Sequence, residues 1–412
     1  MANIHPFQPY RYAPESGPIE NLVTQPYDKI SPSMQQRYLG LSPRNLVRII
    51  LGPRLEGDNE SNNVYTRAAG YLNEWIAKGA VRRDPEPGFY AYFQDFTDPD
   101  SGDRLTRKGF IGLADVVDYD AGIVYRHEHT LAGPKKDRLE LLRHTRAHFG
   151  QIFMLYPDAA GSVDELLDEA AKAEPLVRID DEYGAAHRMW RISEPERVAS
   201  LRARMADRKL LIADGHHRYE TALAFRNENP DLDGAKRVMM TFVNMHSSGL
   251  RILATHRLVY GIDASLVSEF GAKAAEKFRV STLNDLGALK AAWAEPHAGK
   301  IRIGVRTAGG YQLLECDRGA DGLDVRVLHD TILDGMLGIT PEAIRQEKFL
   351  RYMRGVDNAA GTVEKGEMQM AFLLEPTSIQ QVADISFGGG VMPQKSTDFY
   401  PKLLSGVTIY RL

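Results

Sequence analysis

The chain has 412 residues, of which 43% are hydrophobic and 26% are charged, as in an ordinary soluble globular protein. Its formal net charge of −4 gives no electrostatic signature of nucleic-acid binding, and its single cysteine, Cys316, excludes an internal disulfide framework and a cysteine-based zinc site. No apolar run reaches membrane-spanning length and no signal-peptide pattern is present, so we expect a cytoplasmic protein without a membrane partner.

Apolar periodicity and turn residues predict helices and strands that mix along the chain without strict alternation. The expected strands, in chain order, lie at 45–51, 88–96, 105–117, 151–156, twice within 176–192, then at 210–213, 237–244, 253–260, 301–306, 310–316, 369–374 and 403–412. The expected helices lie at 63–78, 139–149, 161–173, 195–208, after residue 215, at 265–278, between 283 and 300, at 325–337, near 355–364 and at 378–385. Such a mixture predicts an α+β fold with a mixed sheet as its core.

Three segments are expected along the chain. Residues 1–264 form the main α+β domain, and residues 265–320 form a small α/β insert. Residues 321–412 form a C-terminal segment that returns to the main domain. By length alone, a chain of this size accommodates two or three domains.

The central stretch, residues 209–223, reads K-L-L-I-A-D-G-H-H-R-Y-E-T-A-L. A strand ends at Asp214, Gly215 permits a tight turn, and helical spacing follows at once. Unpaired N–H groups and the dipole at a helix start, together with Arg218 and the adjacent His216 and His217, suit phosphate or another oxyanion.

Asp214 is an unexpected carboxylate in that setting. It could bind a metal, accept a proton, or only cap the helix, since Asp-Gly is also a common turn and Asp a good cap.

A glycine-rich tail, residues 388–397, reads G-G-G-V-M-P-Q-K-S-T. Its spacing is wrong for a P-loop, because the glycines lie too far from Lys395 and Pro393 intervenes. Lys395, Ser396 and Thr397 still offer donors to an anion. The alternative is an ordered C-terminal loop.

The triplet His127-Glu128-His129 is not the H-E-x-x-H zinc motif, because its histidines lie two residues apart. On a strand both could still face one metal, with a third ligand from His256, Asp214 or His216. Glu128 as a proton acceptor, or as a Mg²⁺ ligand through water, is a further possibility, and so is a simple surface loop.

His256-Arg257 lies inside an apolar stretch and therefore needs partners, because unpaired buried charges are costly. Facing a pocket, the pair would be functional. Bonded to backbone within the core, it would be structural.

Several motifs together resemble an uncharacterised bacterial and archaeal family, the domain of unknown function 1015 (DUF1015). They span nearly the whole chain in order: P-Y-D-K-I-S (26–31), N-L-V-R (45–48), H-E-H-T (127–130), K-x-D-R-L (135–139), A-D-G-H-H-R-Y-E-T-A (213–222), T-H-R-L-V (255–259) and M-P-Q-K-S-T-x-F-Y-P-K (392–402). Departures from the family pattern are mild: Gln25 and Ala254 stand where the family usually has proline.

The central piece also resembles the ParB/sulfiredoxin superfamily, in which G-x-x-R followed by a helix binds nucleotide phosphates. Gly215, Arg218 and Ala222 match that pattern. The superfamily includes CTP-binding partition proteins, an ATP-using sulfinic acid reductase and kinases that act on free serine. The resemblance implies a nucleotide cofactor, namely ATP, ADP or CTP, with Mg²⁺. The absence of a basic face argues against a DNA-binding partition role.

The resulting hypothesis is a nucleotide-dependent phosphotransferase or hydrolase that acts on a small hydroxy metabolite, with free serine as a candidate. Asp214, His216, Glu128 and Lys395 are the expected catalytic residues. The expected cofactor-binding residues are Gly215, His217, Arg218, Thr221, His256, Arg257, Ser396 and Thr397. The expected substrate-binding residues are Tyr27, Asp28, Arg48, His127 and Arg138. The alternative is a nucleotide- or metabolite-sensing regulatory protein without turnover.

Overall fold

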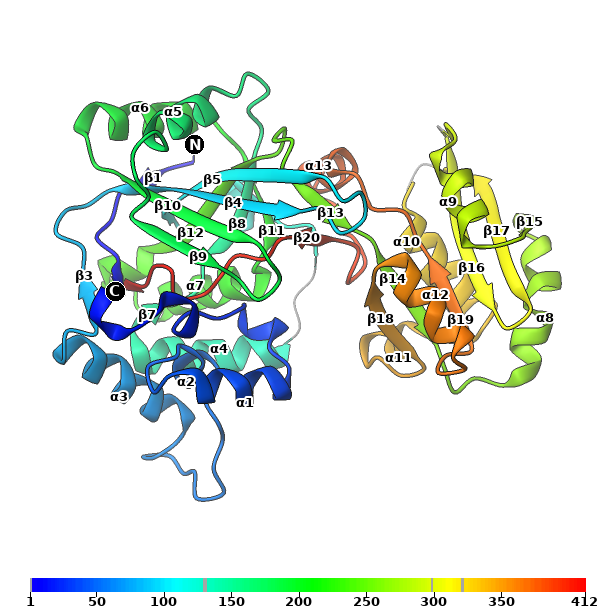
Figure 1. Ribbon diagram of the computed structural model, residues 1–412, viewed down its shortest axis with the longest axis horizontal. Helices are drawn as coiled ribbons and strands as arrows, with labels where there is room; N and C mark the ends of the chain where they lie inside the picture. The colour runs from blue at the N-terminus through cyan, green and yellow to red at the C-terminus, as the bar shows by residue number, and fades with distance from the viewer. Residues whose placement is uncertain (1, 129–131, 298, 320–321) are drawn as a thin grey trace. The chain divides into compact units, whose positions relative to one another are not determined.

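The computed structural model describes residues 2–128, 132–297, 299–319 and 322–412, which divide into two compact units (Figure 1). Unit 1 contains residues 1–251, 383–391 and 399–412, and unit 2 contains residues 252–382 and 392–398. The division differs from the expected one. Strands from residues 265–320 share one sheet with strands from residues 321–382, so these two segments belong to a single unit.

Unit 1 is built on a nine-stranded mixed sheet in the order β6-β11-β8-β12-β5-β4-β10-β9, with β1 paired to β5. Its strands are β1 (Ile4–His5), β4 (Phe89–Thr97), β5 (Arg104–Asp115), β6 (Val124–Tyr125), β8 (Ile152–Tyr156), β9 (Val177–Asp180), β10 (Ala186–Ile192), β11 (Leu210–Asp214) and β12 (Arg237–Asn244). The β11–β6 and β12–β8 pairs are parallel, and the other pairs are antiparallel.

Helices cover both faces of this sheet (Figure 1). They are α1 (Pro32–Leu41), α2 (Val47–Ile50), α3 (Val64–Ala77), α4 (Ala132–Thr145), α5 (Ser162–Ala170), α6 (Pro195–Met205) and α7 (His216–Glu228). α5 and α6 lie on one face, while α7 lies on the other and packs against α4, which in turn packs against α3. Short strands β2 (Tyr10–Tyr12) and β3 (Val81–Arg83) pair with each other, as do β7 (Ala147–His148) and β21 (Tyr410–Arg411).

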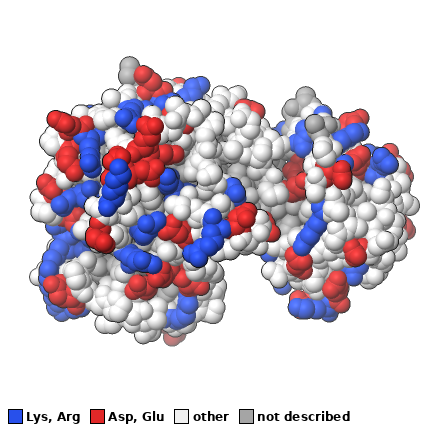
Figure 2. Space-filling model, turned by 45° about the horizontal axis from the view of Figure 1, so that its top comes forward, with Lys and Arg blue, Asp and Glu red and all other residues white. Residues whose placement is uncertain are grey.

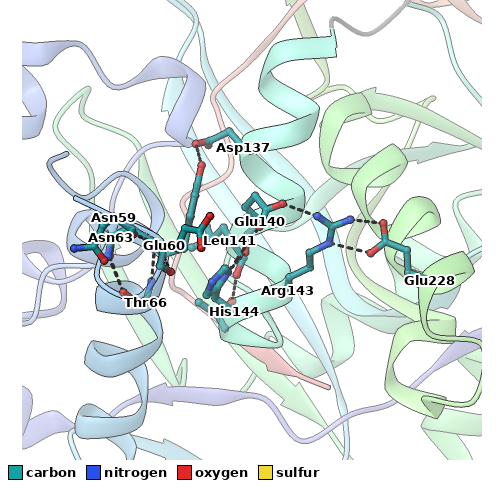
Figure 3. A network of polar contacts seen from close by, with 12 residues as sticks. Asn59, Glu60, Asn63, Thr66, Asp137, Glu140, Leu141, Arg143, His144 and Glu228 are labelled. Carbon is teal, nitrogen blue, oxygen red and sulfur yellow. Dashed lines mark hydrogen bonds and ion pairs between the residues drawn. The ribbon is translucent and has the colours of Figure 1, made fainter. Parts of the chain in front are cut away.

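The α3–α4–α7 layer is fixed by polar contacts (Figure 3). Arg143 of α4 binds Glu140 on its own helix and Glu228 at the end of α7, with 2.6 Å between Nη2 and Glu228 Oε1. α3 begins with a capping box in which the Asn63 side chain accepts from the Thr66 amide and the Thr66 hydroxyl accepts from the Asn63 amide. This layer sets α4 beside α7 and so places their side chains around a common cavity.

Unit 2 is built on an antiparallel six-stranded sheet in the order β15-β17-β16-β19-β14-β18. Its elements are β14 (Thr255–Val259), α8 (Ala264–Ala275), β15 (Arg279–Leu283), α9 (Leu286–Ala294), β16 (Lys300–Thr307), β17 (Gly310–Asp317), α10 (Asp324–Val327), the π-helix η6 (Leu328–Asp334), α11 (Pro341–Arg345), β18 (Leu350–Arg354), α12 (Val356–Glu364) and β19 (Met370–Leu373). Two separate apolar clusters show that both faces of the sheet are covered. The chain passes between the units within β13 (Arg251–Leu253), α13 (Ile379–Phe387) and β20 (Asp398–Tyr400).

The α+β expectation agrees with this architecture, and most predicted elements are present. The prediction of a strand at 45–51 is wrong, because these residues contain α2. The Asn45 side chain accepts from the Val47 amide at 2.9 Å, a local bond that favours a helix start over extended backbone. The predicted strand at 403–412 is reduced to β21, and the helix predicted at 325–337 is divided between α10 and the π-helix.

Charged side chains of both signs are intermixed over the face of each unit in view in Figure 2. That face therefore presents no extended basic surface, in line with the net charge of −4. Among the described residues, we find no helix with the length and apolar character needed to cross a bilayer.

Candidate functional site

The site lies where β11 meets α7 in unit 1. Residues 210–213 are buried in the sheet, and Gly215 then adopts φ +98°, a left-handed conformation that disfavours a side chain. A Cβ at this position would also lie 3.0 Å from Nε of Arg218. Glycine therefore lets the chain turn and leaves room for the arginine that folds back over the turn.

Asp214 is surrounded by positive charge. Its Oδ2 lies 3.0 Å from Nζ of Lys402, and its Oδ1 lies 3.6 Å from Nη2 of Arg218. Burial by itself would raise the pKa of Asp214, but the charges of Lys402, Arg218 and Lys29 outweigh burial and hold this pKa well below its usual range. The carboxylate is thus ionised and orients two cations at the turn.

Lys402 is held in place by a buried polar group of side chains. Arg107, which is 1% exposed, donates to the carbonyls of Tyr400 and Pro401, and Gln94 donates to the carbonyl of Lys402 at 2.9 Å. Gln94 Oε1 in turn accepts from Nε of Arg107 at 3.0 Å. Burial lowers the pKa of Arg107 to about 9, still above neutral pH, so a charged guanidinium fixes the backbone that carries Lys402.

His127 and His216 face each other with ring centroids 4.6 Å apart. Nδ1 of His127 lies 2.7 Å from the Ile212 carbonyl, and Nε2 of His216 lies 3.5 Å from the His127 amide. Burial lowers the pKa of His127 to about 4 and that of His216 well below its usual range. Both imidazoles are therefore neutral at pH 7.

His217 is partly exposed on the first turn of α7. Burial lowers its pKa, against the opposing charges of Asp28 and Glu220. Glu220 lies 3.3 Å from Nζ of Lys135 and 3.5 Å from Nη1 of Arg126. His217 is thus an unprotonated imidazole at neutral pH with access to solvent.

A cavity of about 60 Å³ opens beside this turn, and we call it the cationic cavity. Two arginines line it, Arg138 of α4 and Arg218 of α7, and its other lining residues are Pro26, Tyr27, Ile50, Leu141, Leu142, Ala147, His148, Phe149, Gly150, Thr221 and Ser405. No carboxylate is among the described residues that line it. A small anion is the ligand that such a wall favours.

The arginines and Tyr27 are tightly positioned. The Arg138 guanidinium carbon lies 4.2 Å from the centre of the Tyr27 ring, and Arg138 also binds Asp137 and the Ile50 carbonyl. Arg218 donates to the Gln151 carbonyl. Burial, partly offset by Arg138 and Arg218, raises the pKa of Tyr27 to about 12, so its hydroxyl remains a donor.

Thr221, one turn along α7, also lines the cationic cavity. It is 4% exposed, and its hydroxyl oxygen has no hydrogen-bond partner within the described part of the chain. A buried hydroxyl without a partner costs about 1–3 kcal/mol, and this oxygen is also closed to solvent, so the cavity wall does not present it to a ligand.

Other predicted site residues belong to unit 2. Arg257 is 1% exposed and donates to the carbonyls of Thr255, Gln394 and Lys395. His256 accepts from the Leu374 amide at 3.2 Å, and burial lowers its pKa to about 4. Both side chains are thus bonded to backbone, and a cofactor-binding role for the pair stays a prediction.

The segment with Lys395 is an ordered loop of unit 2. Lys395 has φ +59°, the Ser396 hydroxyl donates to the Pro393 carbonyl at 2.6 Å, and Thr377 donates to the Ser396 carbonyl at 3.0 Å. A role for Lys395, Ser396 and Thr397 in anion binding stays a prediction.

The remaining predictions concern Arg48, Glu128 and a metal. Arg48 donates to the Leu39 carbonyl at 2.8 Å and so links α2 to α1. Glu128 ends a described segment, while His129 lies outside the described residues. Within the described chain, no group of three or more His, Cys, Asp or Glu side chains could hold a metal ion. A role for Glu128, and the Mg²⁺ site, stay predictions.

Sequence reasoning missed Lys402, Arg107 and Gln94. Lys402 ends the M-P-Q-K-S-T-x-F-Y-P-K motif, so the motif offered a signal. Arg107 and Gln94 lie in ordinary strand sequence, and only the pairing of β4 with β5 brings them together.

Comparison with solved structures gives distant matches. A conserved hypothetical protein from Pyrococcus furiosus is 15% identical, with 68% of this chain and 90% of that chain covered and a TM-score of 0.36. A free serine kinase in complex with AMP is 15% identical, with coverage of 67% and 83% and a TM-score of 0.37. SbnI with a C-terminal truncation, from Staphylococcus aureus, is 12% identical, with coverage of 70% and 82% and a TM-score of 0.35. Because these TM-scores lie below 0.5, we draw no conclusion from them.

Comparison with curated protein sequences gives no match. One family model matches residues 4–334, and its description is "Protein of unknown function (DUF1015)". The match covers most of the chain. It includes the β11–α7 turn, and it includes α4 and α7, which line the cationic cavity. The chain therefore belongs to the DUF1015 family.

Proposed function

We propose that the β11–α7 turn binds a phosphate group of a nucleotide and that the protein transfers a phosphoryl group to a small hydroxy metabolite or to water. One observation carries the proposal. The cationic cavity is lined by two arginines, Arg138 of α4 and Arg218 in the first turn of α7, and by no carboxylate of the described residues. Arginine forks are donors that proteins use for phosphate.

The size of the cavity limits what enters it. A volume of about 60 Å³ suits a single phosphate group, so the rest of the nucleotide would lie outside. Mg²⁺ would accompany the nucleotide on its phosphates, where it supplies charge neutralisation.

In the proposed reaction, the acceptor hydroxyl oxygen attacks the terminal phosphorus while the bond from that phosphorus to the bridging oxygen breaks. The hydroxyl proton passes to His217, which is unprotonated at neutral pH and accessible to solvent. Arg218 and Lys402 stabilise the charge that develops on the transferred group, and Asp214 orients both cations.

The test uses the purified full chain with Mg²⁺, free serine as the first acceptor, and ATP, ADP or CTP, followed by ³¹P NMR for product. We expect product with at least one nucleotide and strong loss in Arg218→Met and Arg138→Met. Arg202→Met is the matched control, because Arg202 is an exposed arginine on α6, on the opposite face of the sheet from α4 and α7. Thermal melting of each variant separates loss of function from loss of fold.

Two other outcomes decide between the alternatives. Thermal stabilisation by a nucleotide that depends on Arg218 but gives no product favours a regulatory binding protein. Absence of both nucleotide stabilisation and product contradicts the proposal.

A further inference from the structure

The cationic cavity presents three polar side chains whose hydrogen-bonding atoms have no partner in the described part of the chain. They are the hydroxyls of Ser405 and Tyr27 and the imidazole of His148, and all three side chains line the cavity. The Thr221 oxygen is closed to solvent, whereas the polar atoms of these three side chains are not. The three groups therefore offer hydrogen bonds to a ligand in addition to those of the two arginines.

Ser405 is fixed at the wall of the cationic cavity. It is 4% exposed, and its backbone exchanges two hydrogen bonds with that of Thr24, at 3.2 and 2.8 Å. Its hydroxyl lies close to Gly150, because a Cβ placed on Gly150 would be 3.1 Å from Oγ of Ser405. The same Cβ would be 3.3 Å from Nη1 of Arg218. The hydroxyl and the guanidinium thus flank one space at the cavity wall.

Gly150 keeps that space open. Its φ is not positive, so a residue with a side chain could adopt the same backbone conformation. The close approach of the Ser405 hydroxyl and the Arg218 guanidinium is what disfavours a larger residue at this position. Glycine at position 150 is therefore explained by the room that it leaves beside two hydrogen-bond donors.

His148 ends β7 and contributes an uncharged donor. Its ring lies parallel to that of Tyr410, with an angle of 6° between the planes and 6.0 Å between the centroids, a contact that does not engage the ring nitrogens. Burial lowers the pKa of His148 to about 4, so the imidazole is neutral at pH 7. A neutral imidazole carries one N–H donor and one acceptor nitrogen.

The charges and donors of the cavity identify the ligand class. Arg138 and Arg218 supply two positive charges, and no carboxylate is among the described lining residues. A phosphate attached through one oxygen carries a charge of about −1.5 to −2 near neutral pH and has three free oxygens. A phosphodiester or a carboxylate carries one negative charge and has two free oxygens. Two guanidinium groups with several neutral donors match the phosphomonoester group best.

We propose that the cationic cavity selects a phosphomonoester group, such as the terminal phosphate of a nucleotide, and that Ser405 and His148 donate hydrogen bonds to its oxygens. Gly150 is the residue that leaves room for this contact. The inference rests on the proposed binding of phosphate at the β11–α7 turn, but it does not depend on transfer of the phosphoryl group.

The test is isothermal titration calorimetry of the full chain with methyl phosphate, dimethyl phosphate and acetate, at mildly alkaline pH where methyl phosphate is a dianion. We expect methyl phosphate to bind at least about tenfold more tightly than the two monoanions. The variants are Ser405→Ala, Gly150→Ala, and His148→Phe, which keeps an aromatic ring against Tyr410 and removes both nitrogens.

Each variant should weaken the binding of methyl phosphate by about tenfold, the effect of losing one hydrogen bond to a charged group. Ser405→Ala should keep the melting temperature of the parent, because the Ser405 hydroxyl has no partner in the described chain. The controls, which should bind like the parent, are Ser200→Ala on α6 and Gly40→Ala on α1. A Cβ on Gly40 would have no atom within 4 Å.

The outcomes separate this inference from the proposed function. Methyl phosphate binding that falls in Ser405→Ala and His148→Phe supports the inference, even if the transfer assay gives no product. Binding by the parent that stays unchanged in both variants, or equal affinity for dimethyl phosphate or acetate, overturns the inference alone. Absence of methyl phosphate binding to the parent overturns both the inference and the proposed phosphate site.

Discussion

The ammonium nitrogen of Lys402 lies 3.0 Å from Oδ2 of Asp214, although 188 residues separate them in the chain. Both side chains are largely buried, at 12% and 22% exposure. The ion pair joins the C-terminal segment of unit 1 to the β11–α7 turn. Without Lys402, the negative charge of Asp214 would oppose the anion binding that we propose for this turn.

Replacing Lys402 by Met should lower the free energy of unfolding by about 1–3 kcal/mol, because Asp214 loses a charged hydrogen bond in a partly buried setting. Urea unfolding measures the change. The control is Lys236→Met, since the exposed Lys236–Asp233 pair has a similar distance, 2.8 Å, and surface pairs contribute about 0–1 kcal/mol. Equal losses in the two variants would show that burial of Lys402 contributes nothing.

Replacing Arg107 by Met should lower the free energy of unfolding more than replacing Lys402 by Met does. The carbonyls of Tyr400 and Pro401 would lose their buried donor, at about 1–3 kcal/mol for each unsatisfied group. We also expect lower affinity for phosphate, because these carbonyls belong to the residues just before Lys402. Arg107→Lys keeps the charge but cannot span the same acceptors, so it should recover only part of either loss. A variant with parent-like stability and affinity would contradict this role.

Gly215→Ala should lower the free energy of unfolding by more than the backbone strain of the left-handed conformation accounts for. Strain at φ +98° costs about 1–2 kcal/mol for a residue with a side chain. The added methyl would also press on Arg218, whose Nε lies 3.0 Å away. Gly184→Ala is the matched control, because Gly184 has φ +81° but open space around it. In urea unfolding, Gly215→Ala should lose more stability than Gly184→Ala. Gly215→Ala should also bind phosphate more weakly than the parent.

Thr221→Val separates binding from stability. The free energy of unfolding should stay level or rise by about 1 kcal/mol, because the removed hydroxyl is buried and has no partner among the described residues. Affinity for inorganic phosphate, measured by calorimetry, should stay unchanged, because the hydroxyl oxygen is closed off from the cavity. A fall in phosphate affinity in Thr221→Val, restored in Thr221→Ser, would show that the hydroxyl reaches the ligand.

Stability should decrease as the pH falls from about 6.5 toward 4. The pKa of His127 is about 4 in the folded protein, whereas an unfolded histidine has a pKa of about 6.5. The unfolded chain therefore takes up the proton first, and the stability present above pH 6.5 is lost by about 1.4 kcal/mol per pH unit in that window. His127→Gln should reduce the slope of stability against pH but not abolish it, because the pKa values of buried His216 and His256 are lowered as well; His144→Gln at the surface is the control.

Local patterns predicted local structure well. The strand–glycine–helix order at residues 210–228 follows from apolar spacing and from a turn that only glycine adopts without strain, and both depend on neighbours in sequence. The strand predicted at residues 45–51 is wrong although its apolar run is typical of a strand. A single hydrogen bond, which the Val47 amide donates to the Asn45 side chain, favours a helix start instead.

The sequence by itself determined the family, the α+β composition, and the turn in which Asp214, Gly215 and Arg218 follow one another. Only the tertiary structure decided which charges meet: Lys402 with Asp214, Arg107 with the carbonyls before Lys402, and Arg138 with Arg218 around one cavity. The physical reason is that these contacts depend on the order of strands in the sheet and on the packing of α4 against α7. Neither leaves a periodic signal in the segments that it brings together.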